Sequence, residues 1–322
     1  MPMRQSELPR LSFMLESALT AGKEDLAKMD SQSLHQLVYD VLLPRIEARA
    51  DWETCQKLVL RFKVLGGLGP AATADFQLAV IDATPAARDR QHLRLDVKVD
   101  PLIGKVEGHS PIPLTQEALD SLLGENGERT AFCMPCNSAH WRIDQLEYDR
   151  ENVLFVSMIV ATTDEVAASH PDVRRIGLLA TKDMVDSGIY QKAFSDMGAA
   201  VFPPSALMQE VVNALVYGGD VAGVDCKGVK GGDTGPAPAV LLQKVIDDLY
   251  HQYQVEAFCV SCTELPFLIG QQRNGEWKGN TCGLPVVNST QALARQFVHR
   301  ALTMQAEHLL DFEMVLNNGR VM

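Results

Sequence analysis

AFCMPC, at residues 131–136, returns almost unchanged as AFCVSC at residues 257–262. Each phrase ends a short apolar run and stands directly before a segment with helical spacing. From residue 61 onward, β-branched runs alternate with helical segments, a pattern typical of parallel sheets with helices on both faces. We therefore predict an α/β protein of two similar, pseudo-symmetric lobes, each with one of the phrases at the end of a strand.

The expected strands and helices follow one another along most of the chain. Strands are predicted over residues 61–67, 93–99, 130–135, 153–158, 174–180, 198–204, 256–261 and 284–289. Helices are predicted over residues 71–83, 113–123, 138–148 and 289–310. We expect the first lobe to comprise residues 61–158 plus 288–322 and the second lobe to comprise residues 159–287.

Two segments stand apart from this alternation. Residues 1–60 carry apolar residues at three- and four-residue spacing, which predicts an extension of two or three helices with Ser31 or Ser33 as an N-cap. Residues 223–239 are rich in glycine and proline and predict a long, lid-like loop. We expect the extension to be a packed or oligomer-forming module without a catalytic role.

The composition indicates a soluble cytoplasmic protein. The chain has 322 residues and a formal net charge of −12, which disfavours binding to nucleic-acid phosphates and to anionic membranes. It has no run of the ~18 apolar residues that a membrane span needs, and its first residues do not resemble a signal peptide. The seven cysteines are an odd number, which argues against a disulfide framework. We therefore expect free thiols and no nucleic-acid or membrane partner.

The paired cysteines of each phrase first raise the question of zinc or redox chemistry. Structural zinc sites with two CxxC pairs usually place them about 15–20 residues apart, a far shorter gap than the one between these phrases. A thioredoxin-like CxxC also opens a helix after a strand, but two copies in two lobes do not suit that role. We expect Cys133 and Cys259 to be buried in the core, where a free cysteine packs as a small hydrophobe.

The second cysteine of each phrase, Cys136 or Cys262, stands where open α/β sheets bind ligands, at the carboxyl end of a strand. Each directly precedes a predicted helix, whose N-terminal amides would lower a thiol pKa below its free value of ~8.5. Two lobes facing each other would place one such thiol on each side of a cleft. A base on one face of a carbon and an acid on the other can invert a stereocentre. Two ordinary strand-end cysteines remain the alternative at this point.

Four motifs together resemble the aspartate/glutamate racemase family of cofactor-independent amino-acid racemases. They are GGLGPAAT (66–73), MPCNSAH (134–140), LLATKDMVDSGIY (178–190) and SCTELP (261–266). The resemblance runs in order along about residues 61–305. It implies two Rossmann-like lobes around a cleft, one catalytic cysteine from each lobe, an amino-acid substrate, a homodimer, and no cofactor, neither a metal nor pyridoxal phosphate.

The resemblance also implies roles for particular residues. Cys136 and Cys262 would be the two acid–base thiols, one removing the Cα proton and the other returning a proton to the opposite face. The residues implied in substrate binding are Gly67, Asn137, Ser138, Thr181, Thr263, Glu264 and Lys192. His140, in contrast, is expected to be a packed residue and not a base.

The sequence departs from the family at one position that concerns substrate choice. The family commonly has an Asn pair after the second strand, followed by an Arg that binds the distal carboxylate. Here Val99 and Asp100 replace the pair, and Lys105 is the nearest cation. An Asp at this place would repel an acidic side chain unless a cation offset it, so the identity of the amino acid stays open.

Two other readings remain beside an amino-acid racemase. Maleate cis–trans isomerases and hydantoin racemases use paired cysteines on the same scaffold. A racemase-like fold could also serve as a ligand-binding protein, with the N-terminal helices as an interaction module. Retention of both thiols and of their polar neighbours argues against the binding role, because such a protein has no need of two opposed cysteines.

Overall fold

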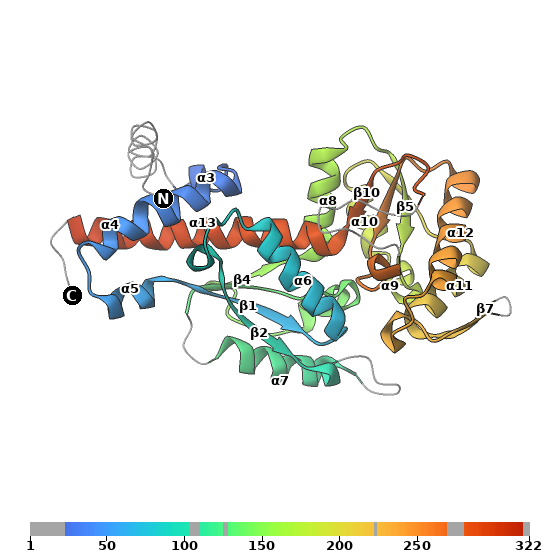
Figure 1. Ribbon diagram of the computed structural model, residues 1–322, viewed down its shortest axis with the longest axis horizontal. Helices are drawn as coiled ribbons and strands as arrows, with labels where there is room; N and C mark the ends of the chain where they lie inside the picture. The colour runs from blue at the N-terminus through green and yellow to red at the C-terminus, as the bar shows by residue number, and fades with distance from the viewer. Residues whose placement is uncertain (1–22, 104–109, 125–127, 222–223, 269–279, 318–322) are drawn as a thin grey trace.

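The computed structural model describes residues 23–103, 110–124, 128–221, 224–268 and 280–317. Within these residues the chain forms two parallel four-stranded sheets, each flanked by helices, and a helical extension that lies beside the C-terminal helix (Figure 1). The predicted fold class of two α/β lobes with an N-terminal helical extension is confirmed. None of the described helices has the length and apolar character needed to cross a bilayer.

The sheet of the first lobe has the strand order β2-β1-β3-β4. Its strands are β1 (Arg61–Gly66), β2 (Arg94–Val99), β3 (Thr130–Cys133) and β4 (Val153–Val156), and its helices are α6 (Pro70–Ala83), α7 (Ile112–Leu123) and α13 (Ser289–Asn317). Side chains alternate across β1: Val64 packs with α6 and α13 on one face, and Leu65 packs with α7 on the other. β3 is buried along its whole length, as expected for a strand with helices on both faces, whereas the edge strand β2 keeps charged residues.

The sheet of the second lobe has the order β10-β9-β5-β6 and repeats the same construction. Its strands are β5 (Arg175–Leu179), β6 (Ala200–Phe202), β9 (Ala257–Val260) and β10 (Val286–Asn288). Its helices are α8 (Met158–Ser169), α9 (Lys182–Ser187), α10 (Ile189–Ser195), α11 (Ala206–Tyr217) and α12 (Pro236–Tyr253). Here Cys259 faces the core under α8 and α10, while Phe258 and Val260 face α11 and α12.

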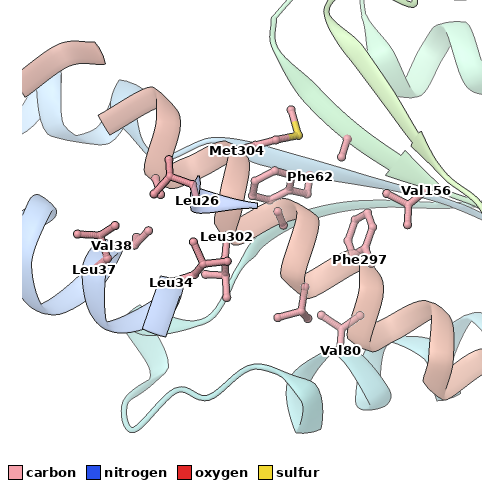
Figure 2. Close-up of a cluster of buried hydrophobic side chains, with 14 of the residues drawn as sticks. Leu26, Leu34, Leu37, Val38, Phe62, Val80, Val156, Phe297, Leu302 and Met304 are labelled. Atoms are coloured by element: carbon pink, nitrogen blue, oxygen red, sulfur yellow. The ribbon is translucent and has the colours of Figure 1, made fainter. Parts of the chain in front are cut away.

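The extension packs along the half of α13 that projects beyond the first sheet (Figure 1). It consists of α2 (Lys23–Leu26), α3 (Ser31–Gln36), the π-helical η1 (Leu37–Leu42), α4 (Leu43–Glu47) and α5 (Trp52–Leu58). Figure 2 shows Leu34 of the extension pointing toward Leu302 of α13, and both side chains are fully buried. Glu313 of α13 is also fully buried, and Arg45 and Arg49 neutralise it. The extension is therefore continuous with the core of the first lobe.

Two local expectations need correction. The N-cap of α3 is Asp30, whose carboxylate accepts from the amide of Ser33 at 2.8 Å, and neither Ser31 nor Ser33 takes that role. The segment expected as a helix over 138–148 is a 3-10 helix, η4 (Asn137–Gln145). Earlier residues of the extension, 1–22, lie outside the described part of the chain.

The expected long loop over 223–239 is instead largely ordered secondary structure. Its described part begins with β8 (Val224–Cys226), which pairs antiparallel with β7 (Gly219–Val221), and continues through the 3-10 helix η5 (Val229–Gly231) into α12. The glycines that predicted a loop supply the turns between these elements. At Gly228 (φ +75°), an added Cβ would lie 2.3 Å from the backbone nitrogen of Gly218. Pro236 takes the first turn of α12, where a missing amide costs nothing.

Candidate active site

The two repeated phrases lie at equivalent places in the two lobes. Cys133 and Cys259 are both fully buried, as predicted, in β3 and β9. Cys136 follows the carboxyl end of β3, where it precedes η4, and Cys262 follows the carboxyl end of β9, where it precedes the 3-10 helix η6 (Leu265–Leu268). The second cysteine of each phrase therefore leaves the sheet at the edge where parallel sheets bind ligands.

Cys136 has a hydroxyl group as its closest polar partner. Its Sγ lies 3.2 Å from Oγ of Ser138, and the side chain is partly exposed. Burial raises the pKa of the Cys136 thiol, the Ser138 hydroxyl opposes that change, and the charge of Glu264 adds to it. Because Glu264 belongs to the second lobe, Cys136 lies within electrostatic range of the opposite side of the site.

His140 anchors the backbone of Cys136. The amide of Met158, at the start of α8, donates to Nε2 of His140 at 2.8 Å, so the ring proton is on Nδ1. That proton is donated to the carbonyl oxygen of Cys136 at 2.8 Å. Burial lowers the pKa of His140 to about 4, which keeps the ring neutral. The expectation that His140 is a packed residue and not a base agrees with this geometry.

Asn137, directly after Cys136, is held from two sides. Its Oδ1 accepts a 2.6 Å hydrogen bond from the hydroxyl of Tyr190 on α10, and its Nδ2 donates to Oγ of Ser289 at 3.0 Å. All three side chains are buried. Both polar atoms of the Asn137 side chain therefore have partners within the protein.

Cys262 has a carboxylate as its closest polar partner. Its thiol donates to Oε2 of Glu264 at 3.3 Å, and the hydroxyl of Thr263 donates to the same oxygen at 2.9 Å. All three side chains are buried. Burial raises the pKa of the Cys262 thiol well above its ordinary value, and the adjacent negative charge of Glu264 raises it further. In this arrangement Glu264 can accept the proton when Cys262 ionises.

The glycine turn after β1 brings the first lobe against Glu264. A Cβ at Gly69 would lie 2.5 Å from Oε1 of Glu264, so a larger residue here would displace the carboxylate. Gly67 has φ +115°, and a Cβ there would lie 2.2 Å from the carbonyl oxygen of Asp100. This turn needs glycine because a backbone segment and a carboxylate approach it closely.

Lys230 is a site residue that the sequence analysis missed. It comes from η5 in the second lobe and donates to the carbonyl oxygen of Leu68 in the glycine turn at 3.1 Å. Its ammonium lies 3.6 Å from Oε1 of Glu264 and 5.1 Å from the ring centroid of Tyr217. A single lysine in a glycine-rich segment carries no local signal for such a role, because the contact depends on how the two lobes meet.

Arg142, in η4, is a second cation that the sequence analysis did not select. Burial lowers its pKa, and the charges of Asp183 and Cys136 oppose that change. Asp183 belongs to α9 of the second lobe, so Arg142 lies within electrostatic range of both sides of the site. The sequence predicts a helix over residues 138–148, and an arginine on such a helix usually faces solvent, so nothing in the sequence marks Arg142 as a site residue.

The structure places the remaining predicted site residues in different surroundings. Thr181 is buried at the carboxyl end of β5, the strand that pairs with β9, and so belongs to the same edge as Cys262. Lys192 is exposed on α10, two residues beyond the inward-facing Tyr190, and does not join this group. Val99 ends β2 beside Gly66 and is 46% exposed. Lys105 lies outside the described residues.

The expectation that helix N-termini lower the two thiol pKa values is wrong in direction. Burial raises the pKa of Cys136 and of Cys262 above that of an ordinary cysteine thiol. Each cysteine precedes a 3-10 helix rather than an α-helix; Cys262 is buried, and Cys136 is largely covered by protein although partly exposed. Desolvation of the charged thiolate therefore outweighs the helix-terminal amides.

Comparison with models of known protein families identifies the family of this chain. A family model described as Asp/Glu/hydantoin racemase matches residues 65–297. The chain belongs to this family. The helical extension precedes the matched region, and the paired cysteines and the glycine turn lie within it. Racemases are isomerases, so the protein belongs to an enzyme family of the isomerase class.

Solved structures of racemases share the fold. The aspartate racemase of Picrophilus torridus is 26% identical, with a TM-score of 0.59 over 75% of this chain and 94% of that chain. An aspartate racemase homologue from Pyrococcus horikoshii OT3 is 20% identical, with a TM-score of 0.56 over 75% of this chain and 98% of that chain. Glutamate racemase from Campylobacter jejuni subsp. jejuni is 16% identical, with a TM-score of 0.51 over 75% and 86%.

Proposed function

We propose that the protein is an amino-acid racemase of the aspartate/glutamate type that uses the thiols of Cys136 and Cys262 without a cofactor. The observation that carries the proposal is geometric: Glu264, which accepts from the Cys262 thiol at 3.3 Å, lies against the glycine turn of the first lobe at Gly69, so the two lobes meet beside the paired cysteines. Two thiols near one carboxylate, on opposite sides of a site, suit a reaction with one proton transfer on each face of Cα. Family membership supports the same chemistry.

The proposed reaction conserves protons over one turnover. Glu264 accepts the proton of Cys262, and the resulting thiolate removes the Cα proton from the substrate. The Cys136 thiol then donates its proton to the opposite face of the carbanion and becomes a thiolate. In the reverse direction the two cysteines exchange roles. At the end of the turnover Cys262 is again a thiol, Glu264 holds one proton and Cys136 is a thiolate beside Ser138, so the proton on Glu264 must return to Cys136, directly or through water, before the next turnover.

Charge around the site supports an anionic substrate. Lys230 and Arg142 are cations within electrostatic range of Cys136. We propose that the ammonium of Lys230 contacts a substrate carboxylate. The substrate would then replace the carbonyl of Leu68 or the carboxylate of Glu264 as the partner of Lys230. Substrate contacts are also proposed for Gly67, Ser138, Thr181 and Thr263, as the family resemblance implies. Stabilising the carbanion then depends on hydrogen bonds to that carboxylate in a site with little water.

The direct test is exchange of Cα hydrogen for deuterium in D₂O, with chiral analysis of the products. A panel of acidic, neutral and basic amino acids is incubated with the wild type, Cys136→Ala and Cys262→Ala. We expect exchange with inversion in the wild type and loss of at least ~10³-fold in both variants. Cys226→Ala, which removes another buried thiol of the second lobe, is the matched control and should keep its activity.

The opposite outcome is equally definite. Absence of exchange with every amino acid, from folded wild-type protein, would exclude an amino-acid racemase. Maleate and hydantoins would then be the next substrates. Ligand binding that survives both cysteine substitutions would indicate a binding protein instead. A cytoplasmic homodimer is proposed from the family resemblance, and light scattering coupled to gel filtration would test the dimer.

A further inference from the structure

Tyr190 joins the interior of the second lobe to the loop that carries Cys136. It is fully buried in the core under α10, and its hydroxyl donates to Oδ1 of Asn137 at 2.6 Å. A buried phenol hydroxyl without a partner would cost free energy, so this bond stabilises the observed arrangement of the two lobes. The family resemblance implies roles for the cysteines and their neighbours, and none for Tyr190.

The hydrogen bond from Tyr190 restricts the position of Cys136 because Asn137 is the next residue in the chain. The remaining polar atom of its side chain, Nδ2, donates to Ser289 at the first residue of α13, where the chain returns from the second sheet to the first lobe. The amide is 3% exposed and has protein partners at both ends. The side chain of Asn137 therefore holds the Cys136 loop in place from two sides, in addition to any contact that it makes with a substrate.

The two anchors of the Cys136 loop differ in what they connect. His140 ties the carbonyl of Cys136 to the first residue of α8. Tyr190 ties the next residue to the hydrophobic cluster that contains Cys259, three residues before Cys262. Tyr190 therefore connects the loop of one thiol to the strand that carries the other.

We propose that Tyr190 is a positioning residue that, through Asn137, sets the place of Cys136 relative to Cys262. This inference rests on the proposed two-thiol reaction. Both sulfurs must face Cα from opposite sides, and a misplacement of ~1 Å can cost about 100-fold in rate. Tyr190 acts through Asn137 and does not itself contact the reacting atoms.

The kinetic test uses Tyr190→Phe, which removes one oxygen atom. We expect kcat to fall about 10- to 100-fold while KM changes less than about threefold, because positioning and not substrate affinity is lost. Asn137→Ala should cause a similar fall, and the double variant should be no worse than the poorer single variant. Tyr39→Phe is the matched control: it removes a hydroxyl of the extension that donates to the carbonyl of His92 in the first lobe, and kcat should be unchanged.

A second measurement does not depend on racemase activity. Iodoacetamide labelling of the native protein, followed by mass spectrometry, gives a rate for each cysteine. In Tyr190→Phe the rate at Cys136 should change at least about threefold, while the rates at Cys262 and Cys55 stay at their wild-type values.

The outcomes separate this inference from the proposed function. Unchanged labelling at Cys136 together with unchanged kcat would overturn the positioning role. Equal changes at all three cysteines would also overturn it, because they would indicate general loosening of the fold. If the wild type racemises no amino acid, the proposed function fails, and the labelling rates of Tyr190→Phe and Asn137→Ala still decide whether Tyr190 positions Cys136.

Discussion

The two lobes use nearly the same six-residue phrase, yet they give their second cysteines different surroundings. Cys136 is partly exposed, lies beside the hydroxyl of Ser138, and has its backbone held by His140. Cys262 is 6% exposed and donates to the carboxylate of Glu264. A hydroxyl can both donate and accept a proton in a hydrogen bond, whereas an ionised carboxylate can only accept.

This difference indicates that the site is asymmetric before any substrate binds. Glu264 provides Cys262 with a proton acceptor at 3.3 Å, while Cys136 has no carboxylate among the partners described for its sulfur. A duplicated backbone therefore does not require duplicated chemistry. Each lobe places its thiol at the same strand end, and the following one or two residues determine its partner.

Substitution of Glu264 should have the largest effect on this comparison. In Glu264→Gln the proton acceptor of Cys262 is lost, and we expect kcat/KM to fall by about 10²- to 10³-fold. The fall must be equal for the two enantiomers, because the equilibrium constant of racemisation is unchanged. Steady-state kinetics in both directions measure it. Glu256→Gln, at an exposed carboxylate before β9, is the control, and an active Glu264→Gln would show that Cys262 needs no neighbouring base.

Lys230 and Lys192 give the next largest contrast. Lys230→Met removes the cation beside Glu264, and we expect kcat/KM for an acidic amino acid to fall about 10- to 100-fold, mainly through KM. Lys192→Met, at an exposed position of α10, should change kcat/KM less than about twofold. The reverse ranking would restore Lys192 as the substrate-binding lysine that the sequence resemblance implies.

The pH dependence of thiol labelling should sharpen the comparison further. Burial raises the pKa of both thiols above that of an ordinary cysteine, so the reactive thiolate is a minor form at neutral pH. We expect the alkylation rate of Cys136 to rise about tenfold per pH unit from pH 7 to 9, with Cys262 slower at each pH because it is more buried. The same peptides in the unfolded chain should level off near their ordinary pKa. A plateau below pH 8 in the native protein would contradict raised pKa values.

The smallest expected effect is on the pH dependence of stability, and its source is His140. Its folded pKa of about 4 lies below the ordinary value of 6.5, so its contribution to folding is present above pH 6.5 and is lost as the pH falls toward 4. The contribution is on the order of 3 kcal/mol. Chemical denaturation at several pH values should show a shallower loss in His140→Phe than in the wild type.

The control for that measurement is His251→Phe, at an exposed histidine of α12. Its unfolding free energy should follow the wild-type pH dependence. An unaltered pH slope in His140→Phe would mean that His140 is not held neutral by the fold. A fall in kcat of His140→Phe well beyond the 10- to 100-fold expected from misplacement of Cys136 would instead indicate that the imidazole takes a direct part in proton transfer.

Much of the architecture could be predicted because it depends on local patterns. The predicted strands at 61–67 and 93–99 agree with β1 and β2, and the buried state of Cys133 and Cys259 is confirmed. The segment 223–239 could not be predicted in the same way. Its glycines are compatible with a loop and with a tight hairpin. The hairpin forms because Gly228 packs closely against Gly218, a contact that the local sequence does not show.

The sequence by itself determined the two-lobed α/β fold and the place of Cys136 and Cys262 at strand ends. Periodicity and residue size encode these features, since each depends on neighbours along the chain. Tertiary structure alone decided that Lys230 reaches Leu68, 162 positions earlier, and that Tyr190 reaches Asn137, 53 positions earlier. Such contacts exist because two separately formed lobes meet along one surface, and the groups opposed there are fixed by packing in three dimensions. Packing also raised the thiol pKa values that helix position alone would have lowered, because the free energy of desolvation depends on everything that surrounds the sulfur.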